Sequence, residues 1–425
     1  MFKKISVKIR RLVAAICFCI VLTVVIVMTQ KIFERKYSYT KYYDFYQQKQ
    51  DFDVLFLGTS HVLNAVYPME LWRDYGIVSY NMANHSENIC TNYWQLQNAL
   101  QYTTPKVVVI DLYAVDGDGK VNEKYLHNFL DEVPFSFMKI EMVCDLLEAE
   151  KRVEYLFNLS LYHSRWEELG ADDLRPARGL EKGAEFRDEV TINVPPTLIP
   201  QDEYDPTARL NKQYLQKIID LCKDQNIGII LTYLPYTMPE GHQRVANWGY
   251  VAAEQNDIPY LNFVYEDIDI NYKTDCADEA HHLNASGARK ITDYLGNYIQ
   301  ENYDVKDHRE DPEYDFWHQD YAEYREMKQG WLNEQENVWS YLLQLNDRDY
   351  VTKIYASDSN YIFQDSEIKE LVNNISFFGK VVHLEQKDGG KDDCFTVEVY
   401  TAEKDELISV HTFVRTAEDR YELQQ

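Results

Sequence analysis

Short apolar runs separated by segments of helical spacing limit the fold of this chain most strongly. Runs as short as these, continuously apolar and bounded by Gly or Pro, are typical of strands buried on both faces of a parallel sheet. Their alternation with helices predicts a three-layer α/β/α fold, whose active site would lie at the carboxyl ends of the strands. The expected strands are residues 53–58, 77–81, 106–111, 227–234 and 258–263, and the expected helices are 91–102, 208–225, 242–255 and 285–303.

The N-terminal segment predicts a membrane anchor. Five cations, Lys3, Lys4, Lys8, Arg10 and Arg11, precede the uncharged apolar run 12–28. With its flanks this run is long enough to cross a hydrocarbon core of about 30 Å, and flanking cations favour the cytoplasmic side. We therefore expect a single-pass protein of a bacterial cell membrane with an extracytoplasmic catalytic domain. A cleaved signal peptide is the alternative, but no small-residue cleavage site follows the run.

The composition indicates which partners are unfavourable and in which cellular compartment the chain would lie. Asp and Glu total 70 against 43 Lys and Arg, and the net charge of -27 disfavours nucleic-acid binding. The seven cysteines are scattered without a Cys-x-x-Cys pair, which disfavours a disulfide framework or a zinc ribbon. An exported domain without such a framework fits a bacterial cell exterior.

Changes in pattern along the chain predict its domain organisation. A basic segment (1–11), the anchor (12–29) and a Tyr-rich stalk (30–50) precede a catalytic domain at 51–304. An insertion at about 116–205 interrupts the strand–helix alternation, with a helical stretch at 138–163, and could form a lid or a substrate wall. Residues 305–425 read as a smaller α/β unit, with helices within 315–345 and 365–373 and strands at 350–357, 381–384, 395–401 and 407–414.

Two motifs could carry chemistry. In Phe56-Leu-Gly-Thr-Ser-His61 a strand ends in Gly58, so Ser60 would stand at the carboxyl end of that strand beside backbone N–H groups able to bind an oxyanion. In Asp278-Glu-Ala-His-His-Leu-Asn-Ala-Ser-Gly287 acids and histidines precede a helix for which Asn284 is a good N-cap. A carboxylate three or four residues before a His can reach its Nδ1 and leave Nε2 to accept a proton from Ser.

Each motif also has a simpler interpretation. Gly-x-Ser after a strand is often only a turn, and the acid–His segment could be a solvated helix cap. It could also bind a metal ion, although no complementary distant ligand set is apparent, so we expect neither metal nor cofactor. The residues that could act as ligands are Asp275, Asp278, Glu279, His281 and His282.

Taken together, the two motifs resemble those of SGNH/GDSL-type serine hydrolases, which have a flavodoxin-like three-layer fold. The resemblance covers about residues 50–304 and is carried by FLGTSH and HLNASG. It is closest to the exported, membrane-anchored branch, which includes the D-alanyl transfer protein of teichoic acid synthesis and alginate acetylation factors that work beside membrane-bound O-acyltransferases.

The resemblance implies roles for individual residues. Ser60 would be the nucleophile and His282 the base, with Asp278 as its acid; the doubled His leaves Glu279 and His281 as substitutes. Gly58 and Asn84 would contribute to the oxyanion site. The Gly that the family uses in a middle motif is not evident here, and Asn81 or Asn84 could equally be a turn residue.

The function expected from these motifs is acyl transfer through an ester of Ser60. The acceptor would be a hydroxyl of an envelope polysaccharide or teichoic acid, or water, and a membrane-bound O-acyltransferase is the expected partner by resemblance. Two alternatives remain open. One is a stand-alone exported esterase or deacetylase, and the other is a catalytically silent scaffold that binds an acyltransferase or a polymer.

Overall fold

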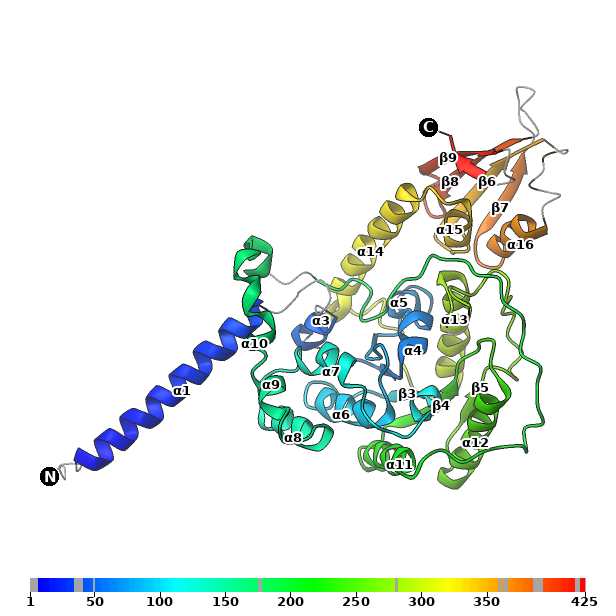
Figure 1. Ribbon diagram of the computed structural model, residues 1–425. Helices are drawn as coiled ribbons and strands as arrows, with labels where there is room; N and C mark the ends of the chain where they lie inside the picture. The colour runs from blue at the N-terminus through cyan, green and yellow to red at the C-terminus, as the bar shows by residue number, and fades with distance from the viewer. Residues whose placement is uncertain are drawn as a thin grey trace. The chain divides into compact units, whose positions relative to one another are not determined.

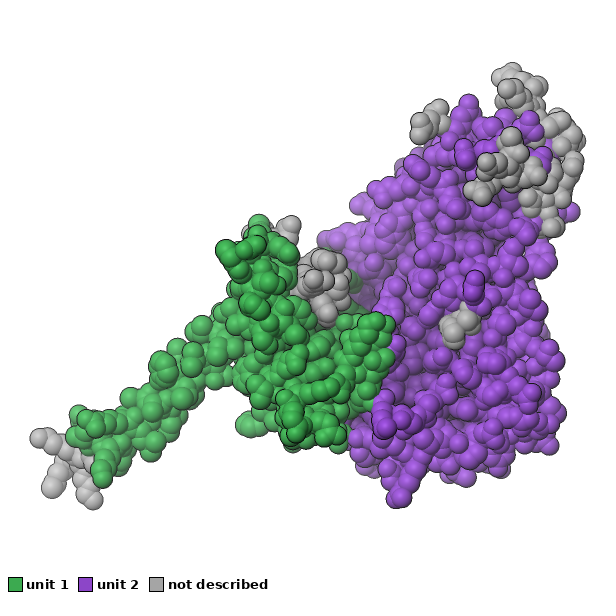
Figure 2. Space-filling model, viewed as in Figure 1, with its two compact units in different colours: residues 1–48, 121–179 green, residues 49–120, 180–425 purple. Residues whose placement is uncertain are grey.

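The computed structural model describes residues 7–33, 41–48, 50–174, 178–279, 282–357, 360, 362, 366–384, 393–416 and 421–424. By their contacts these residues form two compact units (Figure 2). Unit 1 comprises residues 1–48 and 121–179, and unit 2 comprises residues 49–120 and 180–425. The first half of the predicted insertion therefore groups with the N-terminal helix, while the domain boundaries expected at residues 50 and 304 stay predictions.

The regular elements among the described residues of unit 1 are helices and 3₁₀ turns. The long helix α1 (Val7–Phe33) is long and apolar enough either to span a membrane or to be a signal sequence. After α3 (Tyr43–Gln47) the unit continues in the insertion, as the helices α7 (Glu123–Leu130), α8 (Phe137–Leu146), α9 (Arg152–Leu156) and α10 (Leu159–Tyr162) and the 3₁₀ turns η2 (His163–Glu167) and η3 (Ala171–Leu174).

The helical stretch expected at 138–163 is present as separate helices, α8, α9 and α10, followed by the start of η2. The segment breaks after α8, at residues 147–151, and again before α10. Asp145, Glu148 and Glu150 crowd the C-terminal end of α8, where the helix dipole disfavours negative charge, and this gives a physical reason for the first break. Helix α7 had no counterpart among the expected elements.

Unit 2 is built on a five-stranded parallel sheet, which confirms the predicted fold class. Its order is β2-β1-β3-β4-β5, the doubly wound order of flavodoxin-like folds. Because helices cover both faces, strands β1, β2 and β3 are buried along their whole length, and β4 and β5 are buried except at their first residue. The strands are β1 (Val54–Leu57), β2 (Ser79–Asn81), β3 (Val107–Asp111), β4 (Gly228–Tyr233) and β5 (Tyr260–Asn262).

The helices lie on the sheet as right-handed crossovers require. Helices α4 (Ser60–Ala65), α5 (Pro68–Tyr75) and α13 (Ala285–Asn302) pack together on one face (Figure 1). Helices α6 (Ile89–Ala99), α11 (Arg209–Asp224) and α12 (Glu240–Asn256) cover the other. The chain changes direction between β1 and β3, so the carboxyl ends of these two strands form the natural position for a site.

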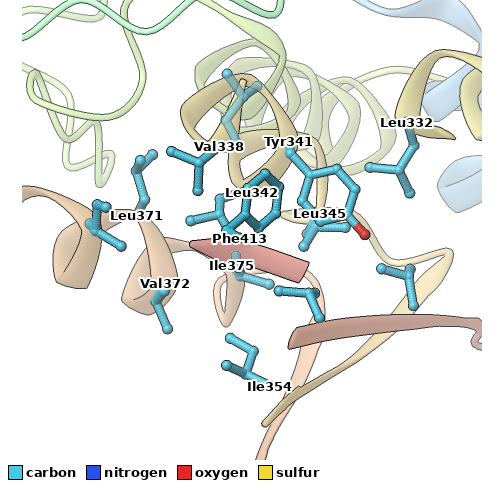
Figure 3. Close-up of a cluster of buried hydrophobic side chains, with 14 of the residues drawn as sticks. Leu332, Val338, Tyr341, Leu342, Leu345, Ile354, Leu371, Val372, Ile375 and Phe413 are labelled. Carbon is cyan, nitrogen blue, oxygen red and sulfur yellow. The ribbon is translucent and has the colours of Figure 1, made fainter. Parts of the chain in front are cut away.

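The C-terminal part of unit 2 has a second, mixed sheet of order β10-β9-β8-β6-β7. Its strands are β6 (Tyr350–Tyr355), β7 (Lys380–Leu384), β8 (Cys394–Thr401), β9 (Leu407–Arg415) and β10 (Tyr421–Leu423), and its helices are α14 (Asp315–Glu334), α15 (Val338–Gln344) and α16 (Ser366–Ile375). Helices α15 and α16 bury Leu342 and Ile375 against Phe413 and Ile354 of the sheet (Figure 3). The short strand β10 was not expected from the sequence.

A buried group of charges joins this second sheet to the first. Asp347 is fully buried and binds Arg73 of α5, Lys328 of α14 and Arg289 of α13 at 2.7, 2.8 and 2.9 Å. Burial alone would raise the pKa of Asp347, but the three cations hold it well below its usual range. Because a buried charge is stable only with its partners, this carboxylate locks three helices to the turn before β6.

Asp347→Asn should therefore lower the free energy of unfolding by about 3–5 kcal/mol, because it leaves buried cations short of a counter-charge. The measurement is urea unfolding of the full chain in detergent at pH 7. Glu403→Gln is the matched control, since Glu403 is an exposed partner of Arg325, and its effect should stay below about 1 kcal/mol. Equal effects of the two substitutions would contradict the locking role of Asp347.

Candidate active site

Ser60 follows the carboxyl end of β1, beside the point at which the chain changes direction between β1 and β3. Strand β1 ends at Leu57, and α4 begins at Ser60 with Thr59 as its N-cap, whose hydroxyl accepts a hydrogen bond from His61 N–H. Gly58 has to be Gly on steric grounds, because a Cβ there would lie 2.5 Å from Val62 Cγ2 and 3.2 Å from Asp111 Cβ. The close approach of β1, α4 and β3 at this point presents Ser60 at the carboxyl edge of the sheet.

His282 meets Ser60 across 222 positions of sequence, and Asp278 binds the other ring nitrogen of His282. Ser60 Oγ lies 2.8 Å from His282 Nε2, and His282 Nδ1 lies 2.5 Å from Asp278 Oδ2. Asp278 Oδ1 also accepts the backbone N–H of His282 at 3.1 Å. The carboxylate can only accept, so Nδ1 carries the proton and Nε2 is left as the acceptor for the hydroxyl of Ser60.

The rest of the His282-Leu-Asn-x-x-Gly motif holds this loop in shape. Asn284 caps α13 by accepting from Ser286 N and Gly287 N, and its Nδ2 donates to the carbonyls of Thr274 and Cys276. A Cβ at Gly287 would lie 2.6 Å from the Asp275 carbonyl oxygen, so only Gly allows α13 to pack this closely against the loop. The motif thus encodes loop geometry as well as a reacting group.

An extended segment from the second half of the predicted insertion runs along the same loop. We call residues 185–193 the strap. Thr191 N–H donates to the Cys276 carbonyl at 2.9 Å, and its hydroxyl donates to the Ala277 carbonyl at 3.0 Å. Asn193 Nδ2 donates to the Asp278 carbonyl at 2.7 Å. The strap therefore supports the backbone that carries the acid.

The C-terminal part of unit 2 holds the loop from another side. Asp275, fully buried, accepts from Lys290 Nζ, Ser286 Oγ and Asn374 Nδ2, each at 2.8 Å. Asn374 belongs to α16 and also donates to Ser286 Oγ at 2.8 Å. A side chain of the C-terminal part of unit 2 thus fixes the start of the segment that contains Asp278 and His282.

The predicted oxyanion residues lie on the side of the site formed by β1 and β2. The carbonyl of Gly58 accepts from Asn92 Nδ2 at 3.1 Å, which fixes the turn before Ser60. Asn84 is buried after β2, and its Oδ1 accepts from His85 N–H at 2.9 Å. Asn81 is structural, since its Nδ2 donates to the carbonyls of Val62 and Val66. The oxyanion role of Gly58 and Asn84 stays a prediction.

Aromatic rings form a wall beside Ser60. His61 stacks on Tyr113 with ring centres 3.9 Å apart, and its ring centre lies 5.0 Å from that of Tyr236 and 5.6 Å from that of His282. Tyr236 Oη lies 2.5 Å from His242 Nδ1. His61, Tyr113 and Tyr236 follow the carboxyl ends of β1, β3 and β4, and the buried His61 and Tyr236 pack the interior beside Ser60.

Asp111 is a buried acid beneath this wall. It ends β3 and accepts from Tyr113 N–H, Leu234 N–H and the Thr232 hydroxyl at 3.1, 2.9 and 3.2 Å. Burial raises the pKa of Asp111 from 3.8 to about 7, despite these hydrogen bonds. The sequence showed it only as the end of a strand.

The remaining predicted residues have simple outcomes. Glu279 is exposed, and His281 lies outside the described residues. Within the described ranges, no group of three or more His, Cys, Asp and Glu side chains is arranged to hold a metal ion. Of the possible metal ligands, Asp275 binds Lys290, Asp278 binds His282, and His282 binds Ser60.

Sequence reasoning missed three of the residues that support the loop, Asn193, Lys290 and Asn374, and named Asp275 only as a possible metal ligand. None of the four has a local motif for this role, because each acts on a segment distant in the sequence or on the loop interior. One feature of the sequence could have drawn attention to this support: Lys290 is a cation within the helix predicted after Asn284. No reading of the sequence pairs it with Asp275.

Comparison with known proteins yields structural likeness alone. No protein-family model matches the chain, and no curated protein matches it. Similar solved structures include a GDSL-like lipase from Bacteroides thetaiotaomicron, with 12% identity and a TM-score of 0.32 over 62% of this chain and 97% of that one. A psychrotrophic esterase from Pseudoalteromonas sp. has 13% identity and a TM-score of 0.30 over 59% of this chain and 97% of that one. A family 3 carbohydrate esterase from Clostridium thermocellum has 12% identity and a TM-score of 0.30 over 59% of this chain and 96% of that one. Likenesses at this level carry no argument about activity, which rests on the geometry of the site.

The raised pKa of Asp111 predicts a pH-dependent stability. Below about pH 4 both folded and unfolded chains hold the proton, so Asp111 carries no penalty. Between pH 4 and 7 the unfolded chain ionises first, because its pKa is 3.8 against about 7 in the fold, and the free energy of unfolding falls. The stability of the native chain relative to Asp111→Asn should therefore drop over this range and level off above pH 7. Urea unfolding of both proteins at several pH values measures it; a constant difference would contradict the assignment.

Asn374→Ala should disorder the loop that carries Asp278 and His282. It removes two donors from buried oxygens, at a cost of about 1–3 kcal/mol each when an acceptor is left unsatisfied. We expect a serine-reactive phosphonate to label Ser60 at least tenfold more slowly, measured by intact mass over time. Asn373→Ala, at the exposed neighbour on α16, is the matched control. Unchanged labelling in Asn374→Ala would show that α16 does not position the loop.

Proposed function

We propose that this chain is a serine esterase or acyltransferase that works through an acyl ester of Ser60. The observation that carries the proposal is the continuous hydrogen-bonded series from Ser60 Oγ to His282 Nε2, and from His282 Nδ1 to Asp278. A hydroxyl, an imidazole and a carboxylate in this order form the arrangement that activates a serine nucleophile. The resemblance of the two motifs to SGNH hydrolases supports the same assignment.

The residues would divide the reaction as follows. His282 Nε2 takes the proton of Ser60 as Oγ bonds to the carbonyl carbon of an ester, and Asp278 stabilises the imidazolium. Backbone N–H groups at the start of α4, with Asn84, would hold the oxyanion. His282 then returns the proton to the departing alcohol, leaving the acyl group on Ser60. An incoming hydroxyl repeats the sequence in reverse and frees Ser60.

The acceptor in this proposal is a hydroxyl of an envelope polysaccharide or teichoic acid. An α1 inserted in the membrane, with Lys8, Arg10 and Arg11 on its cytoplasmic side, would place unit 2 outside a bacterial cell. A membrane-bound O-acyltransferase would then be the source of acyl groups. Support for this finer proposal is the apolar α1 and the motif resemblance.

Hydrolysis is the second candidate activity, and one observation favours it. The side chains of Asp278 and His282 remain 36% and 20% exposed, so water reaches the site. An acyl-Ser60 open to water would hydrolyse unless an acceptor displaced the water. The ratio of transfer to hydrolysis is therefore the property that distinguishes the two candidates.

Ser60→Ala should abolish covalent labelling by a serine-reactive phosphonate and reduce hydrolysis of p-nitrophenyl acetate by at least about a thousandfold. Intact mass and initial rates of the full chain in detergent measure both. Ser376→Ala, at an exposed position, should behave as the native protein. Labelling that persists in Ser60→Ala would show that Ser60 is not the nucleophile. In the native protein, an increase in acyl transfer and a decrease in hydrolysis on addition of a glycan acceptor would favour the transferase.

A further inference from the structure

Helix α1 has an inverted pattern of burial at its C-terminal end. Its apolar stretch, residues 12–28, has no buried residue, whereas the polar Gln30 two positions later is 5% exposed. In a water-soluble helix the apolar residues would be the buried ones. The change from exposed apolar to buried polar side chains marks where the helix leaves one solvent and meets the rest of unit 1.

Gln30 and Phe33 are bound by the insertion at this boundary. Gln30 Nε2 donates to Asn158 Oδ1 at 2.9 Å, and Arg165 donates to the carbonyl of Phe33 at 2.7 Å. Arg165 also binds Asp173 at 2.7 Å, which ties η2 to η3. Helix α10, η2 and η3 all contact α1. We call residues 159–174, which form these three short elements, the collar (Figure 1).

The position of these contacts along α1 sets the depth of the collar. At about 1.5 Å rise per residue, Gln30 lies roughly 3 Å and Phe33 roughly 7.5 Å beyond Met28, the last residue of the apolar stretch. The headgroup layer on each side of the hydrocarbon is roughly 5–7 Å deep. An α1 that spans a membrane would therefore place the collar at the headgroup layer.

Each element of the collar exposes one large hydrophobic side chain. Leu161 of α10 is 41% exposed, Trp166 of η2 is 66% exposed, and Leu174 of η3 is 68% exposed. In water such a set is unfavourable, but at a membrane surface it is favourable, and Trp in particular is enriched at the level of the headgroups. Three elements that hold the end of α1 thus present apolar side chains at the depth where a membrane would accept them.

We propose that the collar lies in the headgroup layer of the outer leaflet, with Trp166, Leu161 and Leu174 inserted between lipids. This rests on the proposed membrane insertion of α1 and goes beyond it. The collar makes unit 1 a membrane-seated base, attached by one helix across the bilayer and by three side chains on its surface. The lipid is the occupant that the geometry favours, because the surface is continuous with the membrane-spanning stretch of α1.

The test uses the full chain reconstituted in phosphatidylethanolamine–phosphatidylglycerol vesicles containing lipids brominated either near the headgroup or deep in the acyl chain. Bromine quenches Trp fluorescence only at contact. We expect shallow bromines to quench more than deep ones, and Trp166→Phe to remove most of that quenching. Trp339→Phe, a half-buried Trp in unit 2, is the matched control and should leave it unchanged.

The outcomes separate this inference from the proposed membrane insertion of α1 on which it rests. If the chain floats with the vesicles but Trp166→Phe keeps the native quenching, the collar does not enter the lipid and the inference is overturned, while the anchor stands. Such a result would point to a protein partner as the occupant of the collar. If the chain does not float with the vesicles, α1 is not an anchor. The membrane insertion of α1 and the lipid contact of the collar are then both overturned, and the proposed chemistry of Ser60 is unaffected. Since Trp166 is exposed, circular dichroism of the variant should match that of the native chain.

Discussion

The described residues of the loop that carries Asp278 and His282, 275–279 and 282–284, form one isolated β-bridge, between Cys276 and Leu283, and belong to no helix or longer strand. The shape of this part of the loop therefore depends on hydrogen bonds from other segments. The most important of these hydrogen bonds are made by Asp275. Its buried carboxylate binds Lys290 of α13, Ser286 at the start of the same helix, and Asn374 of α16. A carboxylate buried without partners would be strongly unfavourable, which makes this arrangement specific. The contact between Ser60 and His282 depends on it, since a small shift in this loop would separate Nε2 from Oγ.

This dependence gives the C-terminal part of unit 2 a role that its own surface does not reveal. Through Asn374 it supports the loop, and through Asp347 it holds α5, α13 and α14. Helix α13 directly follows the loop that carries Asp278 and His282, and α5 follows α4, which begins at Ser60. By binding α5 and α13, the C-terminal part of unit 2 therefore supports the elements next to both segments of the site. The second sheet is therefore part of the framework of the site rather than an appended module.

Much of the fold could be predicted because it is encoded locally. The strands β1, β3 and β4 are short apolar runs, and α13 begins at Asn284, where the sequence shows an N-cap. Both motifs point to a hydroxyl and an imidazole, and the structure brings Ser60 to His282. The breaks between the helices of residues 137–162 were not predicted, although the acids at the end of α8 are visible in the sequence, because tertiary packing can override local preferences of this size. The grouping of residues 121–179 with α1 depends on contacts of α10, η2 and η3 with that helix, among them the hydrogen bond from Gln30 to Asn158, for which no sequence pattern exists.

What the sequence by itself determined is therefore the class of fold, the apolar length of α1 and the identity of the groups able to react, because periodicity and residue type are local properties. Only the tertiary structure decided which acid contacts which histidine, how the strap and α16 hold them, and where the insertion attaches. Those features depend on hydrogen bonds between segments far apart in the chain, whose partners are chosen by distance in space. Asp278 and His282 are four residues apart, yet the support that aims them at Ser60 comes from residues 193, 290 and 374.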